Sequence, residues 1–106
     1  MRVMIPEVIK DLRRHLETLY GQRLLRLVLY GSWARGEATE TSDVDVAVVL
    51  SGSVQPGREI DRMVDAVTDL NLRYATLISI YPVSEEDFRT LNSPLLINLR
   101  REGVPA

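Results

Sequence analysis

Apolar residues recur every three or four positions in two stretches of the chain, which is the spacing of one face of an α-helix. The first stretch covers residues 5–20, with Pro6 in its first turn and Gly21 directly after it, both typical of helix ends. The second covers about 58–73, and charged residues occupy the other positions of both stretches. The pattern predicts two amphipathic helices whose charged sides face solvent.

Three shorter apolar runs predict β-strands: LLRLVLY at 24–30, DVDVAVVL at 43–50 and YATLISIY at 74–81. In the second run, alternation places Asp43 and Asp45 on one face of the strand and only apolar side chains on the other. The third run ends at Pro82, which lacks the N–H that a sheet requires. The connection through 31–42 is short for a parallel crossover, so we expect the first two strands to be antiparallel and the sheet to be mixed.

Serine caps predict two more helices after the third strand. Ser84 is followed by three acidic residues, which the helix macrodipole favours in a first turn. Ser93 and Pro94 begin the last helix, and Gly103 ends it. The expected order is α-β-(turn)-β-α-β-α-α, an α+β fold in which helices pack on a three-stranded mixed sheet, in a single domain over 1–106.

Composition narrows the class of protein further. With 106 residues, 45% hydrophobic and 26% charged, the chain has the make-up of one packed domain. Its net charge of −2 implies no general attraction to nucleic acid or to anionic membranes. The lack of cysteine excludes disulfides and thiolate metal sites, and His15, the only histidine, has no partner for zinc. Charge begins too early for a signal peptide and no apolar run approaches about 18 residues, so we expect a soluble, cytoplasmic protein.

Asp43 and Asp45 stand at the head of a strand that is otherwise apolar. Aspartate is rare in strands, and two on one face repel each other unless positive charge lies between them. Side chains two apart, about 6.5–7 Å along a strand, suit one or two hard cations, and Mg²⁺ is the usual one because it also accepts phosphate oxygens. The alternative is that both aspartates pair with arginines at an exposed strand entrance.

A candidate phosphate-binding turn precedes the aspartates, because Gly31 and Ser32 directly follow the first predicted strand. A glycine there lets the backbone approach a ligand. The serine hydroxyl, the N–H groups of a short turn and Arg35 close behind can hold phosphate oxygens. Ordinary turn chemistry is the alternative for Gly31, Ser32 and Gly36. Together with the two aspartates, the turn indicates a site that holds a nucleoside triphosphate and a metal ion.

The spacing of these residues resembles a known signature. Gly31 and Ser32, ten further residues and then Asp43, Val44 and Asp45 are similar to the GSx10DxD motif of the nucleotidyltransferases related to DNA polymerase β. The longer stretch GSWARGEATETSDVDVAVV, the short chain and the ending NLRREGV resemble the minimal nucleotidyltransferase branch of that family.

This resemblance implies the small nucleotidyltransferase fold, Mg²⁺ as cofactor, and transfer of a nucleoside monophosphate from a triphosphate such as ATP with loss of pyrophosphate. It also implies a partner. Minimal members often act as the antitoxin beside a HEPN-domain toxin, which they bind and to which some of them transfer AMP.

The resemblance also assigns roles to residues. Asp43 and Asp45 would be the metal ligands and the catalytic carboxylates, and Gly31 and Ser32 would bind the triphosphate. Arg35 is a further candidate for phosphate binding.

Two neighbouring residues are expected to have structural roles. Ser42 is assigned to the nucleotide-binding part of the site and is also expected to cap the turn into the strand. Trp33 occupies a variable, often bulky position, and packing in the core is expected there rather than stacking on a base.

The third predicted strand departs from the family pattern. Active relatives commonly carry a third carboxylate there, which binds metal and helps to deprotonate the attacking hydroxyl, whereas 74–81 contains no Asp or Glu. Ala75 or a neighbour stands at that position. Thr76 and Ser79 are poor replacements, because neutral hydroxyls bind Mg²⁺ weakly and are weak bases.

Two functions therefore remain in view. The first is a Mg²⁺-dependent enzyme that moves AMP from ATP to a hydroxyl of a HEPN-type toxin and so acts as its antitoxin. The second is a binding module that neutralises the toxin and has a weak or inactive nucleotide site. The joint spacing of the motif disfavours an unspecialised domain. We expect no direct binding of nucleic acid, and homo-oligomerisation stays open.

Overall fold

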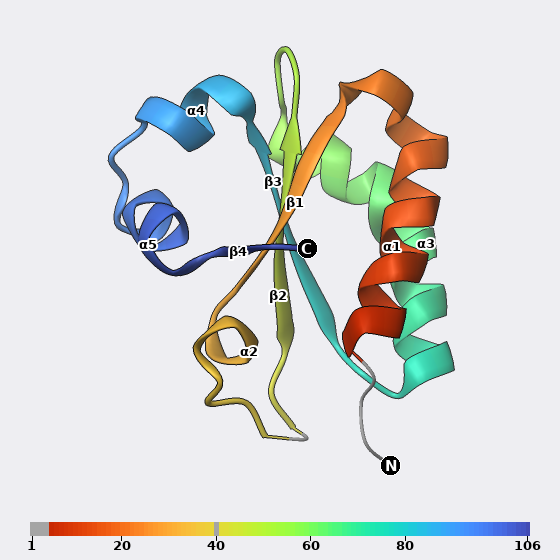
Figure 1. Cartoon of the computed structure of the whole chain (residues 1–106). Helices are drawn as coiled ribbons and strands as arrows, with labels where there is room; N and C mark the ends of the chain where they lie inside the picture. Colours follow the sequence, from red (N-terminus) through yellow and green to blue (C-terminus); the bar gives the residue numbers. More distant parts are fainter. Residues whose placement is uncertain (1–4, 40) are drawn as a thin grey trace.

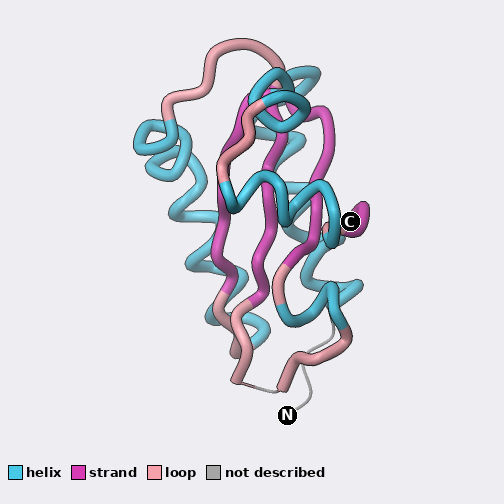
Figure 2. The backbone as a smooth tube through the Cα atoms, turned by 90° about the vertical axis from the view of Figure 1, so that its left-hand side faces the viewer, coloured by secondary structure: helices cyan, strands magenta, loops and turns pink. Residues whose placement is uncertain are grey.

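The computed structural model describes residues 5–39 and 41–106. Its fold is a four-stranded sheet with helices on both faces. Its elements in chain order are α1 (Ile5–Tyr20), the 3₁₀ turn η1 (Gly21–Arg23), β1 (Leu24–Tyr30), α2 (Ser32–Arg35), β2 (Val44–Leu50), α3 (Pro56–Tyr74), β3 (Ile78–Ser84), α4 (Glu85–Thr90), α5 (Pro94–Glu102) and β4 (Val104–Pro105). The strand order is β3-β2-β1-β4. α1 and α3 cover one face of the sheet, and α4 and α5 lie on the other, as Figure 1 and Figure 2 show.

The predicted helices and the mixed sheet are confirmed. β2 runs antiparallel to β1 and parallel to β3. α1 has the expected bounds, and α3 extends slightly beyond the predicted 58–73 at both ends. Ser84 and Ser93 cap α4 and α5, because their hydroxyls accept hydrogen bonds from the N–H groups of Asp87 (3.1 Å) and Leu96 (3.2 Å).

The third strand lies further along the chain than predicted. β3 spans Ile78–Ser84 rather than 74–81. Tyr74 is instead the last residue of α3, and Ala75 caps that helix with a φ of 50°. The apolar run 74–81 therefore does not form one strand: it begins at the last residue of α3 and ends within β3.

The outer edge of β3 explains why proline does not end the strand. The Leu77 carbonyl accepts from the Val44 N–H of β2 (2.8 Å), so odd-numbered residues pair with β2 and even-numbered ones direct their peptide groups outward. At the outward positions, the Ile78 N–H donates to Asn71 Oδ1 (2.8 Å), and Pro82 has no N–H to donate. An outward position on an edge strand is one that tolerates proline.

The sheet has four strands rather than the predicted three. β4 pairs antiparallel with β1, with Val104 opposite Leu29 and Pro105 opposite Val28. A strand of two residues leaves no alternation in the sequence, which is why it was not predicted. The four-residue helix α2 lies in the connection that was expected to be a turn, and it is also too short to show a period.

β2 is buried on both faces over most of its length. On the side of α1 and α3, its even-numbered residues pack in the core with Leu12, Leu16, Met63 and Leu70. On the other side, Ala47 and Val49 pack with Val28, Val83, Leu96 and Leu99. Asp45 shares this second face but lies near the beginning of the strand, where burial is partial. The predicted alternation is confirmed, and the core fixes the strand that carries Asp45.

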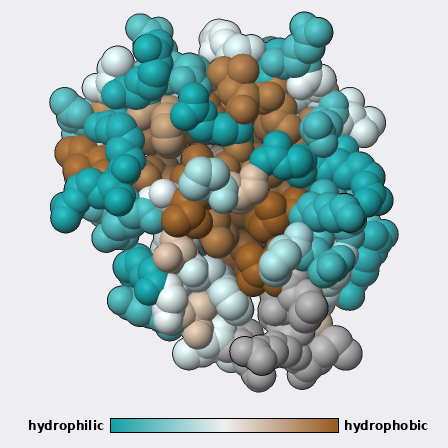
Figure 3. Space-filling view, viewed as in Figure 1, coloured by the Kyte–Doolittle hydropathy of each residue, from teal (hydrophilic) through white to brown (hydrophobic). Residues whose placement is uncertain are grey.

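Apolar surface gathers over β1, β4 and the start of α1, and Figure 3 shows it ringed by polar side chains. Leu25 and Val104 are exposed there. Ile5, Ile9 and Leu29 line a cavity of about 410 Å³ beside the end of β4. Among the described residues, no helix combines the length and the apolar character needed to span a membrane.

Glu59 of α3 is buried in the core, with 3% of its surface exposed. The Tyr20 hydroxyl of α1 donates to Glu59 Oε1 (3.0 Å), and Arg62 Nη1 lies 3.7 Å from the same oxygen. Burial and this hydrogen bond raise the pKa of Tyr20 to about 12. The hydroxyl therefore supplies a hydrogen bond to a carboxylate that burial has removed from water.

We expect Tyr20→Phe to lower the free energy of unfolding by about 1–3 kcal/mol, because it leaves a buried acceptor unsatisfied while the ring keeps its packing. Urea unfolding followed by circular dichroism measures the change. Tyr74→Phe is the matched control, since the Tyr74 hydroxyl bonds Asp11, which is more exposed than Glu59 and lies 3.6 Å from Arg73. That loss should be smaller, and equal losses would contradict the role assigned to Tyr20.

Candidate active site

The end of β1 and the beginning of β2 lie side by side, joined through α2 (Figure 1). Antiparallel pairing puts Tyr30 directly opposite Asp45. The residues that follow Tyr30 therefore meet those around the start of β2. The structure in this way brings Gly31 and Ser32 to the same end of the sheet as Asp43 and Asp45.

The carboxylate of Asp45 lies directly against Gly31. The backbone of Gly31 has φ 73° and ψ −154°, a conformation that favours glycine. A β-carbon at this position would overlap Asp45 Oδ2 and lie 3.2 Å from Asp45 Cγ. Gly31 is therefore required twice, for the turn out of β1 and for the space that the carboxylate occupies.

α2 is a single turn that starts at Ser32. The Arg35 N–H donates to the Gly31 carbonyl (3.2 Å), and the Glu37 N–H donates to the Ser32 carbonyl (2.9 Å). The first N–H groups of a helix have no acceptor within it. Those of Ser32 and Trp33 are therefore available for the oxygen atoms of a ligand.

In the described part of the chain, no basic side chain forms an ion pair with either aspartate. Burial raises the pKa of Asp45 above its usual range, the charge of Asp43 raises it further, and Arg35 lowers it only in part. Arg35 instead forms ion pairs with Glu37 (3.2 Å) and Glu102 (3.5 Å). Among the described residues, neither aspartate pairs with an arginine, so the alternative of a purely structural ion pair finds no support there.

The carboxylates of Asp43 and Asp45 suit a hard divalent cation that takes its remaining ligands from water or phosphate. Asp43 and Asp45 offer only carboxylate oxygens, which are the donors that Mg²⁺ prefers. Within residues 5–39 and 41–106, no group of three His, Cys, Asp or Glu side chains could hold a metal ion alone. An ion held by the two aspartates would take its other ligands from water or phosphate, as Mg²⁺ does when it binds with a nucleotide.

Ser79 stands where a third acidic ligand would complete the site. Parallel pairing in register sets Ser79 of β3 beside Asp45, on the same face of the sheet. Ala75, which was expected near this place, instead caps α3 ahead of the strand. The neighbouring strand thus presents a hydroxyl, which is a weak ligand for Mg²⁺ and a weak base.

The other predicted residues surround the aspartates. Arg35 is exposed and links α2 to α5 through Glu102. The Ser42 hydroxyl accepts from the Thr39 N–H (2.9 Å), which confirms that Ser42 caps the turn before β2. Trp33 packs against the core on the side of α1 and α3, which confirms the predicted packing role.

Tyr30 and Glu102 were not predicted as site residues. Burial and the nearby charge of Asp45 raise the pKa of Tyr30 to about 12, with a smaller contribution from Tyr81. The Tyr30 hydroxyl therefore stays protonated beside Asp45 and can donate a hydrogen bond. Glu102 reaches Arg35 from the far end of the chain, and the only signal for it was the similarity of the ending NLRREGV to the family.

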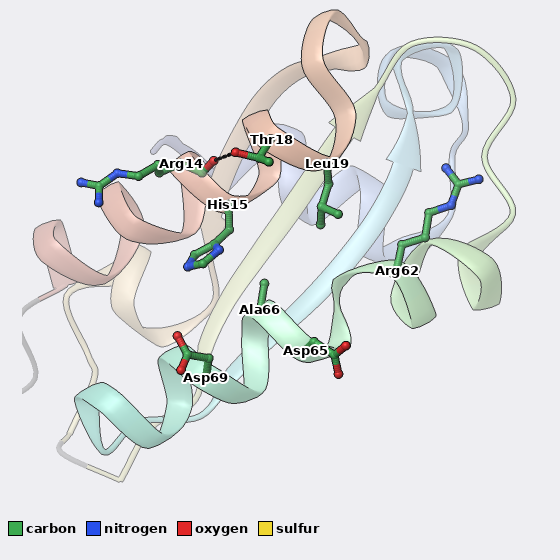
Figure 4. Close-up of a pocket in the computed structure, with 8 residues that line it drawn as sticks. All are labelled: Arg14, His15, Thr18, Leu19, Arg62, Asp65, Ala66 and Asp69. Carbon is green, nitrogen blue, oxygen red and sulfur yellow. Dashed lines mark hydrogen bonds between the residues drawn. The ribbon is translucent and has the colours of Figure 1, made fainter.

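A separate groove of about 540 Å³ lies between α1 and α3 (Figure 4). His15 points into it from α1, and Ala66 and Asp69 line it from α3. Among the described residues, these side chains form no metal-binding cluster. Because the groove and Asp45 are on opposite sides of the sheet, the groove is not part of the candidate active site.

Comparison with known proteins places this arrangement in a family. The model of the nucleotidyltransferase domain matches residues 9–95. A protein of Methanocaldococcus jannaschii named "Putative protein adenylyltransferase" is 35% identical over 92% of this chain and 92% of its own length. A second protein of that organism with the same name is 33% identical over 71% of this chain and 75% of its own length. The chain is a nucleotidyltransferase and belongs to the nucleotidyltransferase domain family.

Two solved structures share the fold. One is described as a toxin-antitoxin with AMP-PNP, and its similar chain gives a TM-score of 0.66 at 17% identity, covering 93% of this chain and 69% of that one. The other is a "putative nucleotidyltransferase from Sulfolobus solfataricus", with a TM-score of 0.57 at 19% identity over 93% of this chain and 76% of that one. At these identities the likeness concerns the fold, and it agrees with the small mixed sheet.

We expect Gly31→Ala to weaken Mg²⁺-dependent ATP binding by at least about tenfold, because the added β-carbon would displace a ligand carboxylate. Isothermal titration calorimetry measures this affinity. Gly36→Ala is the matched control, since Gly36 has nearly the same φ (72°) but open space around its Cα. Its left-handed conformation (ψ 19°) costs alanine about 1–2 kcal/mol, so it controls for a positive φ, and it should keep its affinity. Equal losses in the two variants would show that strain, and not the position of Asp45, decides binding.

We expect Asp45→Asn to raise the melting temperature at pH 7 by a few degrees when no metal is present. Because folding raises the pKa of Asp45, its ionised form destabilises the folded state, and this penalty disappears as the pH falls through that pKa. The difference from wild type should therefore vanish toward about pH 4. Asp61→Asn, at an exposed position of α3, is the comparison variant and should leave the melting temperature at pH 7 close to that of wild type. A lower melting temperature for Asp45→Asn at pH 7 would contradict the expectation.

Proposed function

We propose that this protein transfers AMP from ATP to a hydroxyl of a partner protein, that it requires Mg²⁺, and that it acts as the antitoxin of a HEPN-type toxin. The observation that carries the proposal is the contact between Gly31 and the Asp45 carboxylate, because it sets the turn that we expect to bind phosphate beside an expected metal ligand. The names of the relatives support a protein as acceptor, and the toxin-antitoxin structure supports a toxin as partner. The HEPN class rests on the resemblance to minimal nucleotidyltransferases.

The residues have distinct tasks in this reaction. Mg²⁺, when bound, neutralises charge on the triphosphate and polarises the phosphoryl group that is transferred. Asp43 and Asp45 hold the ion, and the turn at Gly31 and Ser32 binds phosphate oxygens. The acceptor oxygen bonds to the α-phosphorus while the bond from that phosphorus to the bridging oxygen breaks. AMP is thereby transferred, pyrophosphate leaves, and the hydroxyl proton passes to water.

The open position of the site favours a protein as acceptor. Asp43 is exposed at the end of the sheet, and Asp45 is only half-buried. Transfer by positioning and electrostatics works best where water is excluded. A partner protein that covers the site would exclude water and hold its own hydroxyl in line with the α-phosphorus.

Ser79 favours a second candidate function. It is the residue beside Asp45 on β3, so within residues 5–39 and 41–106 this strand places no carboxylate next to Asp45. A site with two ligands can still bind Mg²⁺ with a nucleotide, because phosphate and water complete the coordination. The second candidate is therefore an antitoxin that neutralises its partner by binding and has a weak or inactive nucleotide site.

Transfer can be tested with ATP labelled at the α-phosphate, Mg²⁺ and the protein encoded by the neighbouring gene. We expect label on the partner, and we expect EDTA or Asp45→Asn to reduce it by at least about 100-fold, because both remove the charge stabilisation of the transferring group. Gel autoradiography and mass spectrometry measure the product. ATP labelled at the γ-phosphate is the matched control and should leave the partner unlabelled, because that label departs with pyrophosphate.

Two further measurements separate the candidates. If the pair binds, no label appears and Asp45→Asn still neutralises the toxin in a growth assay, the binding module is correct and the enzyme is not. Ser79→Asp would then be informative, because it supplies a third carboxylate beside Asp45. Increased labelling by Ser79→Asp, but not by Ser79→Asn, would identify the missing acid as the reason for weak transfer.

A further inference from the structure

Asp43 is not held by a strand, in contrast to Asp45. β2 begins at Val44, and Asp43 is exposed just before it. The side chains of the core therefore do not fix its carboxylate. Its position depends on how the residue before it is held.

Four hydrogen bonds hold that residue, Ser42, and one of them joins its hydroxyl to Thr39 Oγ1 (3.4 Å). Its N–H donates to the Thr39 carbonyl (3.1 Å), and its hydroxyl accepts from the Thr39 N–H (2.9 Å). Its carbonyl accepts from Trp33 Nε1 (3.4 Å). The bonds to Thr39 close a turn, and the bond to Trp33 ties this turn to α2.

Trp33 anchors the other end of the connection. It directly follows Ser32 in α2, and its ring packs against the core on the side of α1 and α3. The Trp33 indole thus joins the start of α2, where Gly31 and Ser32 lie, to Ser42, the residue before Asp43. It links the turn expected to bind phosphate with the aspartates expected to bind metal.

We propose that Trp33 and Ser42 form a brace that positions the Asp43 carboxylate relative to Asp45, so that cation binding changes the surroundings of the indole. Ser42 is then a positioning residue in addition to the nucleotide-binding role predicted from the sequence, because its hydroxyl accepts from the Thr39 N–H. The brace deepens the proposed function and rests on it, since it requires that a divalent cation binds the two aspartates.

Manganese binding, followed by electron paramagnetic resonance of the free ion, tests the brace without relying on transfer activity. Mn²⁺ is a suitable probe because it accepts carboxylate and water oxygens. We expect Ser42→Ala to weaken Mn²⁺ binding about tenfold, since losing a residue that orients a metal ligand costs roughly 10–100-fold in affinity. Trp33→Phe removes the N–H but keeps a ring in the core, and it should weaken binding in the same sense.

Two variants serve as controls. Ser42→Thr keeps a hydroxyl and should restore the affinity that Ser42→Ala loses. Thr41→Ala removes the hydrogen bond between Thr41 Oγ1 and Thr39 Oγ1 (3.0 Å) in the same connection, and it keeps the bonds of Ser42 to the Thr39 backbone and to Trp33. It should bind Mn²⁺ within about twofold of wild type. Thermal unfolding of every variant separates a loss of affinity from a loss of fold.

Fluorescence gives an independent measure, because Trp33 is the only tryptophan of the chain. Adding Mg²⁺ alone should change the emission of the wild type in a saturable way. Asp45→Asn should abolish this change. Ser42→Ala should shift its midpoint to about tenfold higher Mg²⁺ concentration, in step with the loss of Mn²⁺ affinity.

The outcomes distinguish the brace from the function on which it rests. If Ser42→Ala and Trp33→Phe bind Mn²⁺ as tightly as wild type while Asp45→Asn does not, the brace is wrong and the proposed function stands. If the wild type fails to bind Mn²⁺ even with ATP present, both fail. A loss that Thr41→Ala shares, or that Ser42→Thr does not restore, would mean general damage to the connection and would also overturn the brace.

Discussion

The contact between Gly31 and the carboxylate of Asp45 sets the geometry on which the rest of the site depends. It requires the positive φ of Gly31 at the end of β1 and the register that places Tyr30 opposite Asp45. The apolar face of β2 fixes this register, because a slip of one residue would turn the core side chains toward the site and the aspartates toward the core. The core therefore decides where the carboxylate of Asp45 stands, although the core residues of β2 that fix the register belong to the other face of the strand.

The same arrangement accumulates negative charge that the described part of the chain does not neutralise. Burial and the charge of Asp43 both raise the pKa of Asp45, while Arg35 is shared between Glu37 and Glu102. A fold keeps such repulsion only where its surroundings over-determine the conformation, and the double-sided burial of β2 beyond Asp45 provides this. The carboxylates that would bind a cation therefore lower the stability of the folded protein when no cation is present. A bound cation relieves their repulsion and so stabilises the folded state.

Periodic and locally capped elements were predictable from the sequence, and short elements and distant contacts were not. The alternation in DVDVAVVL indicated both faces of β2, and Ser84 and Ser93 marked helix starts because a cap is a local hydrogen bond. The motif likewise predicted which residues meet at the site. The ion pair between Arg35 and Glu102 joins the two halves of the chain, which no local pattern encodes. Pro82 was misleading because its tolerance depends on β3 being at the edge of the sheet, which is a property of the whole fold.

The edges of the sheet bear on how this protein meets other chains. β4 is two residues long. On β3, Pro82 has no N–H and the Ile78 N–H donates to Asn71 of α3, so Ile80 is the outward N–H donor between these two positions. An extended segment of another molecule therefore finds no continuous row of donors along β3, and such rows are what allow strands of separate molecules to aggregate. At the opposite edge β4 pairs only with Val28 and Leu29, so the first half of β1 is not covered by it. The two edges of the sheet thus differ, and extension by a foreign strand is disfavoured at the edge formed by β3.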